Sequence, residues 1–285
     1  MAKKFDSLSS IIIVALIFLN FTVWVAILFN RPQEHSEIDF LDVGQGDATL
    51  VIFPGGVKIL TDAGPDSKII KSLERGGAKG KYIDLAIISH PQLDHFNGFN
   101  YLLDRYRFGA FIVNGREGEI PEWREFLAKT KALKIPIITL GASDKISYQD
   151  SRINFLAPLP EMLGSAELND TAFVSLVETR GVKLLLTGDI GKNIEDFLVK
   201  KYRPETLHAD ILKVAHHGSK FSSGNVFLKA VEPKIAVISV GKNTYGHPTK
   251  DALDRLATVG AKIFRTDQGG TLKLIVNNGK LSVFH

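Results

Sequence analysis

Histidine and aspartate side chains follow several apolar, strand-like segments of this chain, and both residue types bind divalent metal ions. The densest group is His90, Asp94 and His95 in IISHPQLDHFNG (residues 87–98), directly after the strand-like run LAIIS. A rigid strand can fix the first ligand, and the loop after it can turn the others toward the same ion. We therefore expect a metal site at this strand end.

Three further strand ends carry the same residue types. Asp189 follows LLLTG, His216 and His217 follow ILKVA, and His247 lies in a Gly/Pro turn after IAVISV. Asp189 could instead cap the helix expected in GKNIEDFL. Neighbouring side chains on an extended strand point to opposite faces, so we expect only one of His216 and His217 to be a ligand. Isolated structural residues explain four such strand ends poorly.

The segments that must position these residues are short runs rich in Val and Ile, bounded by Gly, Pro, Asn or Asp. Pro121 and Thr249 suit helix starts, and Gly260 suits a helix stop. Hairpin-like strands followed by strand–helix alternation, and then the same again, favour an α+β fold of two packed sheets with helices outside. Amphipathic stretches predict helices at residues 67–77, 97–106, 121–133, 194–202, 223–231 and 249–260.

The N-terminal segment is apolar from Ile11 to Phe29 and uncharged from Ser7 to Asn30. This length predicts one transmembrane helix, and Lys3 and Lys4 before it predict a cytoplasmic N-terminus. A cleaved signal peptide is the alternative, although the run is longer than a usual h-region and lacks an A-x-A exit. We expect a membrane anchor at 1–30, a linker at 31–37 and an extracytoplasmic hydrolase domain at 38–285, in a single-pass protein of the cell membrane.

The composition narrows the chemistry further. The chain has no cysteine, which excludes disulfides and thiolate ligands, so a metal must be held by His, Asp, Glu, Asn or Gln. The formal net charge of +4 is too small to indicate nucleic-acid binding by itself.

Six motifs occur in an order that resembles the metallo-β-lactamase domain of ComEC-type competence proteins, from Ile38 to the C-terminus. They are LDVGQGDATLVIFPGGVKILTDAG, SHPQLDHFNG, LLLTGD, LKVAHHGS, SVGKNTYGHP and FRTDQGG. The combination of DVGQGD, HHGS and YGHP is specific, whereas each motif alone is not. The resemblance implies a four-layer αββα metallo-β-lactamase sandwich, one or two divalent metal ions (Mn or Zn) and hydrolysis of a phosphodiester.

The resemblance also implies roles for individual residues. It makes His90 a ligand of a first ion, Asp94 and His95 ligands of a second ion, Asp189 the bridging carboxylate, and His216 or His217 the last histidine. Gln92 and Asn169 stand where the wider fold has histidines. An amide oxygen is a poor zinc ligand, so Gln92 weakens the first site.

Other motif residues are candidates for supporting roles. Asp42 and Asp47 could orient ligands or a water molecule, and Asp62 could support a ligand, although hairpin-turn roles are the alternative. Asp94, Asp189 and His247 are the catalytic candidates; His247 could protonate the leaving oxygen, stabilise a turn or bind metal. Further supporting or substrate-binding candidates are Asn169, Ser219 and Lys220. Cationic side chains that could contact a phosphate, or be merely solvated, are Lys220, Lys242, Lys250 and Arg265.

The resemblance implies a metal-dependent phosphodiesterase or nuclease that acts on DNA, and the predicted N-terminal span places it outside the cytoplasmic membrane. Its expected partners are nucleic acid or another phosphodiester and, through the N-terminal helix, the membrane. Two alternatives remain: hydrolysis of another ester or a lactone on the same fold, and a non-catalytic binding domain that has lost its first metal through Gln92.

Overall fold

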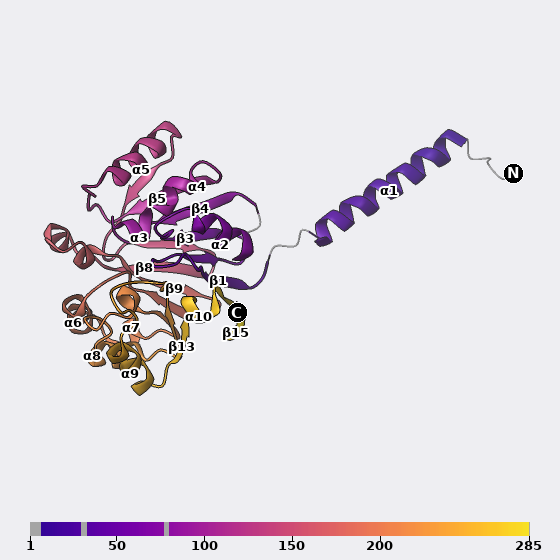
Figure 1. The fold of residues 1–285 in the computed structure, drawn as a ribbon. Helices are drawn as coiled ribbons and strands as arrows, with labels where there is room; N and C mark the ends of the chain where they lie inside the picture. The colour runs from indigo at the N-terminus through magenta and orange to yellow at the C-terminus, as the bar shows by residue number, and fades with distance from the viewer. Residues whose placement is uncertain (1–6, 30–32, 77–79, 285) are drawn as a thin grey trace. The chain divides into compact units, whose positions relative to one another are not determined.

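The computed structural model describes residues 7–29, 33–76 and 80–284. The chain forms two compact units, Met1–Glu34 and His35–His285, each drawn in Figure 1. Helix α1 (Ser7–Phe29) covers the predicted N-terminal helix. Within the described part of the chain, however, no helix is long and apolar enough to cross a membrane, so the structure does not support the predicted membrane anchor. Lys3 and Lys4, on which the predicted cytoplasmic N-terminus rests, lie outside the described residues.

The second unit contains two sheets. The first sheet has the order β15-β14-β1-β2-β3-β4-β5-β6 and joins hairpin strands to the parallel strands β3 to β6. Its strands are β1 (Ser36–Phe40), β2 (Thr49–Ile52), β3 (Lys58–Thr61), β4 (Tyr82–Ile87), β5 (Arg107–Val113), β6 (Ile137–Thr139), β14 (Leu272–Asn277) and β15 (Lys280–Phe284).

The second sheet has the order β13-β12-β11-β10-β9-β8-β7, in which β10 to β13 are parallel. Its strands are β7 (Lys145–Tyr148), β8 (Ser151–Ala157), β9 (Val174–Thr179), β10 (Val182–Leu186), β11 (Ile211–Lys213), β12 (Ile235–Ile238) and β13 (Lys262–Arg265).

The two sheets pack face to face. Ile38 and Phe40 of β1 belong to one buried cluster with Phe155 of β8 and Leu184 of β10. Because side chains alternate along a strand, the opposite faces of both sheets remain for the helices to cover. Figure 1 shows α2, α4 and α5 over the first sheet and α6, α8 and α9 over the second. The predicted αββα sandwich is confirmed.

The helices begin where the sequence supplies start signals. Pro121 occupies the first turn of α5, and the Thr249 hydroxyl accepts a hydrogen bond from the Ala252 amide at the start of α9. The helices of the second unit are α2 (Lys68–Gly76), α3 (Leu93–Phe96), α4 (Gly98–Leu102), α5 (Pro121–Ala132), α6 (Lys192–Lys201), α7 (Pro204–Leu207), α8 (Asn225–Val231), α9 (Lys250–Thr258) and α10 (Thr266–Gly269). The 3₁₀ turns are η1 (Pro160–Gly164), η2 (Leu168–Thr171) and η3 (Ala215–Gly218).

Candidate metal centre

Four side chains from both sheets meet at one edge of the sandwich. Asp94 and His95 lie on α3 after β4, Asp189 follows β10, and His217 lies in η3 after β11. One potential ligand atom of each lies within 4.8 Å of the others. Asp189 is central, because its carboxylate oxygens lie 3.4 Å from His95 Nε2 and 3.4 Å from His217 Nε2. The structure therefore brings the predicted second-site residues together.

The His95 ring is oriented by an acceptor behind it. His95 Nδ1 lies 2.9 Å from Asp62 Oδ2, and Asp62 also accepts hydrogen bonds from the Ser89 amide and hydroxyl at 2.8 and 2.7 Å. Asp62 thus lies in the supporting position proposed from the sequence. Since Nδ1 faces this carboxylate, Nε2 is the nitrogen that faces the cluster.

His217 is oriented in the same manner by a backbone acceptor. Its Nδ1 lies 2.8 Å from the Ser239 carbonyl oxygen, and its Nε2 lies 3.3 Å from Asp94 Oδ2. His216 and His217 are not extended, because both have left-handed backbones with φ of 51° and 52°. The expected strand alternation is therefore wrong: both histidines line the same cavity, with His216 Nε2 3.9 Å from Asp189.

The loop between β1 and β2 closes over the cluster. The Asp47 amide donates to the Asp94 carbonyl oxygen at 3.1 Å. Gly46 has φ of 147°, and a Cβ there would collide with that same carbonyl, so glycine permits the close approach. Asp47 is buried, and its Oδ1 lies 3.4 Å from His217 Nδ1. The DVGQGD motif therefore places the Asp47 carboxylate beside His217, one of the candidate metal ligands.

A buried lysine beneath the centre was missed from the sequence. The Lys213 side chain is 3% exposed, and its ammonium contacts Asp47 and lies 3.8 Å from Asp189. Burial opposes the charge, but Asp47 and then Asp189 raise the pKa of Lys213 above its usual value. The signal was a lysine within the apolar strand ILKVA. Lys213 is a fixed cation for the surrounding carboxylates.

The carboxylates dominate the electrostatics. Burial lowers the pKa of His217, yet Asp189 and Asp47 together raise it to about 10. Burial likewise opposes charge on His95, and Asp189 and Asp62 hold its pKa well above the usual value. Burial raises the pKa of Asp94, but His95 and His217 lower it to about 2. A site that favours cationic imidazoles so strongly also favours a metal cation in place of those protons.

The donor set fits a divalent metal ion. His95 Nε2 and Asp189 Oδ1 are buried and have no hydrogen-bond partner among the described residues. Ligand atoms about 2 Å from a shared ion lie roughly 3–3.5 Å apart. The two 3.4 Å spacings around Asp189, and the 3.3 Å between His217 Nε2 and Asp94 Oδ2, match this range. Two imidazole nitrogens and two carboxylates, from His95, His217, Asp94 and Asp189, would hold the ion.

The donors proposed for a first ion are less complete. His90 is fully buried, its Nδ1 lies 3.0 Å from the Ser89 hydroxyl, and its Nε2 has no partner among the described residues. Asn169 Oδ1 is likewise unpartnered there, and both Asn169 and Gln92 line the cavity beside the cluster. The candidate first site therefore has one imidazole, from His90, and two side-chain amides, from Gln92 and Asn169, at the positions where the wider fold has histidines.

Three residues of the cluster, Asp94, Asp189 and His217, line a 360 Å³ cavity, and the fully buried His95 lies behind them. His247 lies in its wall, with its ring centre 5.6 Å from that of His216 and 5.8 Å from that of Tyr245, which is 74% exposed. The lining residues are Gln45, Pro65, Gln92, Leu93, Asp94, Asn169, Asp189, His216, His217, Tyr245 and His247.

Several predicted residues lie outside this cavity. Lys250 pairs with Asp254, Arg265 with Asp267, and Lys242 is exposed, so among the described residues these cations do not line it. Lys220 lies over the Phe221 ring, and the Ser219 hydroxyl accepts a hydrogen bond from the Phe221 amide.

Two predicted aspartates have other surroundings than expected. Asp42 lies in a different hollow and pairs with Lys68. Asp189 is not a helix cap, because Gly191 caps α6.

With the fold and centre described, the chain can be placed: it belongs to the metallo-beta-lactamase superfamily, whose family model matches residues 41–242. It is 29% identical over 90% of its length to ComE operon protein 3 of Bacillus subtilis, and 30% identical over 87% to competence protein ComA of Neisseria gonorrhoeae. Both are ComEC-type competence proteins, so the predicted resemblance is confirmed. The chain spans about a third of these relatives' lengths, 36% and 33%.

A solved structure agrees on the fold. The metallo-beta-lactamase fold protein YhfI from Bacillus subtilis superposes with a TM-score of 0.55 at 14% identity, covering 82% of this chain and 98% of YhfI. Members of this superfamily are typically metal-dependent hydrolases, and the Asp94–His95–Asp189–His217 cluster is a candidate divalent-metal site of that kind.

Proposed function

We propose that this protein is a metal-dependent phosphodiesterase whose substrate is nucleic acid. The observation that carries the proposal is the cluster of Asp94, His95, Asp189 and His217, three of which line the cavity. A cation bound there supplies Lewis acidity, which polarises a phosphodiester and favours deprotonation of an attacking water. Similarity to competence proteins supports the phosphodiester over other esters and lactones.

The chain's own residues orient the reaction. Asp189 lies between His95 and His217 and presents one carboxylate oxygen to each ring. Asp94 is about a third exposed, in contrast to the buried Asp189. Its carboxylate therefore faces the cavity and can accept a hydrogen bond from the attacking water.

His247 is the proposed proton donor to the leaving oxygen. Burial and the nearby His216 and His217 lower its pKa, so the ring is mostly neutral at pH 7. A neutral ring donates poorly; the role therefore requires the protonated minority form, which becomes more populated as the pH falls.

The extracytoplasmic location is part of the same proposal and rests on the sequence. The charge pattern around the apolar N-terminal run predicts a cytoplasmic N-terminus. Protease added to intact spheroplasts should digest the second unit, and full protection would refute this topology.

The function is tested with the full chain, loaded in turn with Mn²⁺, Zn²⁺ or Mg²⁺, on single-stranded DNA, duplex DNA and a small chromogenic phosphodiester. Wild type should hydrolyse at least one of them, and Asp189→Ala should reduce the rate by roughly 10²-fold or more while losing tight metal binding. Asp196→Ala, which changes an exposed aspartate on α6, is the matched control. Retained metal and turnover in Asp189→Ala would remove the basis of the proposal, and a metal-bound but inert wild type would favour a binding domain.

A further inference from the structure

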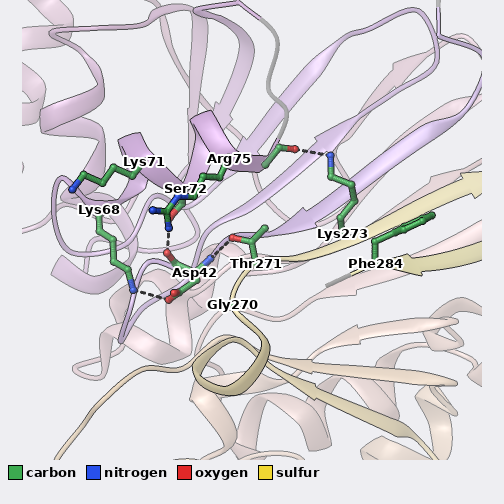
Figure 2. Close-up of a pocket in the computed structure, with 10 residues that line it drawn as sticks. Asp42, Lys68, Lys71, Ser72, Arg75, Gly270, Thr271, Lys273 and Phe284 are labelled. Carbon is green, nitrogen blue, oxygen red and sulfur yellow. Dashed lines mark hydrogen bonds and ion pairs between the residues drawn. The ribbon is translucent and has the colours of Figure 1, made fainter.

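A second hollow, of 450 Å³, lies beside α2 and contains four basic side chains. Figure 2 shows Lys68, Lys71 and Arg75 projecting from α2, with Lys273 and Phe284 on β14 and β15 across from them. The hollow contains one acidic side chain, Asp42, whose charge is offset by Lys68 at 2.7 Å. We call this hollow, defined by Lys68, Lys71, Arg75 and Lys273, the basic groove.

The basic side chains follow the helical repeat of α2. Lys68, Lys71 and Arg75 are separated by three and four residues, so they share one face of the helix. The opposite face buries Ile69 and Leu73 against the first sheet. The row lines a hollow, which gives a ligand several cations at once rather than one.

Two of these cations are available to a ligand. Lys273 is held by Glu37 and by the Gly76 carbonyl oxygen, and Lys68 is held by Asp42. Lys71 and Arg75 are exposed and have no ion pair within the part of the chain that the structure describes. Two uncompensated positive charges about a turn apart suit neighbouring phosphates of a polyanion.

The basic groove adjoins the metal cavity through two short segments. Pro65 lines the cavity and lies three residues before Lys68, and Gln45, which also lines the cavity, belongs to the loop that carries Asp42. The Gly44 amide donates to Asp42 Oδ1 at 3.0 Å, within that loop. A chain of phosphates could therefore pass from the basic groove to the metal cavity along one surface.

The metal cavity itself has no lysine or arginine among its described lining residues. Lysine or arginine contacts to the phosphates of a long substrate must then come from outside it. Phe284, which is 50% exposed, adds an aromatic ring to the basic groove. Cationic side chains that track a backbone, together with an exposed ring on which a base can stack, are the features that bind single strands without sequence preference.

We propose that the basic groove binds the phosphodiester backbone of single-stranded nucleic acid and leads it to the metal cavity. The identity of the polymer rests on the function proposed above. Lys71 and Arg75 provide the phosphate contacts, and Phe284 provides the stacking surface. The residues do not react; their role is to raise the affinity for long substrates.

The test compares Lys71→Gln/Arg75→Gln with wild type in the full chain. The control, Lys200→Gln/Lys229→Gln, makes the same charge change at exposed positions on α6 and α8, which cover the second sheet. Binding of a labelled oligothymidylate is measured by anisotropy over a salt series without added metal. Because each single-strand phosphate contact contributes about 0.7 to the slope of log K against log salt, the groove variant should lose about 1.4 and the control should lose none.

Two further measurements separate the basic groove from the catalytic centre. With metal, the groove variant should raise the KM for long single strands and leave hydrolysis of the small phosphodiester unchanged. Phe284→Leu should weaken binding of single strands more than of duplex. Equal salt slopes in wild type and groove variant, or no oligothymidylate binding by wild type, would overturn the proposal. Groove-dependent binding by a protein that hydrolyses no phosphodiester would support the basic groove and refute the proposed function instead.

Discussion

Asp62 Oδ2 lies 2.9 Å behind His95 Nδ1 and thereby fixes the nitrogen that faces Asp189. The two residues follow neighbouring parallel strands: Asp62 comes directly after β3, and His95 lies on α3, which follows β4. The same carboxylate is anchored by the Ser89 amide and hydroxyl. This contact makes the orientation of a candidate ligand depend on a residue that does not itself face the cavity.

We predict that Asp62→Asn lowers metal affinity by roughly 10–100-fold while leaving all four candidate ligands in place. The amide keeps the size of the side chain but removes the negative charge that favours an Nδ1 proton. Isothermal titration with Mn²⁺ and Zn²⁺ gives the affinity, and thermal unfolding checks the fold. Unchanged affinity in a folded variant would show that Asp62 does not support the site.

The buried Lys213 makes a prediction about stability. Lys213→Met keeps the length of the side chain but removes the buried ammonium that contacts Asp47 and lies near Asp189, which should destabilise the metal-free protein by about 3–5 kcal/mol. Denaturant unfolding measures the change, with the exposed Lys200→Met as control. A loss below about 1 kcal/mol would mean that the carboxylates are satisfied without Lys213.

Gln92 makes a prediction about metal preference. We expect Mn²⁺ to support activity better than Zn²⁺, because amide and carboxylate oxygens favour harder cations of higher coordination. Gln92→His should then raise zinc affinity at the first site and the bound zinc stoichiometry. Metal analysis and rates for both proteins, each loaded with Mn²⁺ or Zn²⁺, decide this. Equal zinc binding would show that Gln92 does not contribute to a metal site.

Asp39, which lies outside the metal centre, should make the stability of the protein depend on pH. Burial, and next Glu37, raises its pKa from 3.8 to about 8, and both of its carboxylate oxygens lack a described hydrogen-bond partner. When folding raises the pKa of a carboxyl group, its contribution to stability is fully present below the unfolded pKa, here about pH 4. The contribution is lost as the pH rises toward the folded pKa, here about 8. Asp39→Asn should therefore match wild type near pH 4 and exceed it by about 2–4 kcal/mol at pH 9.

Denaturant unfolding at several pH values tests whether Asp39→Asn gains stability over wild type as the pH rises, with the exposed Asp196→Asn as control. A parallel pH dependence of wild type and Asp39→Asn would show that Asp39 ionises normally in the folded protein.

The strongly patterned parts of the chain were predictable. Apolar runs such as LLLTG located the strands that lead into the site, because buried strands of a sandwich leave a clear hydrophobic signal. The strands β6, β7 and β15 were not predicted; β6 is exposed throughout, so it lacks that signal. The N-terminal helix was predicted, whereas its role as a membrane span was not supported.

The site was predictable by residue type but not by orientation. Asp94, His95, Asp189 and His217 were all candidates, yet strand alternation gave the wrong geometry for His216 and His217 because it assumed an extended backbone. Lys213 was missed because a lysine in a strand usually points to solvent. Only the packing of the second sheet against the first shows that this one is enclosed by carboxylates.

The origin of the four clustered side chains has a consequence for folding. Asp94 and His95 come from the first sheet and Asp189 and His217 from the second, so neither half of the chain carries a complete set. An ion held by all four would join distant segments as a cross-link does, and it would bind the docked sandwich far more tightly than an open chain. Metal occupancy would then report that the two sheets have assembled, and fragments of either half would remain unmetallated until they recombine.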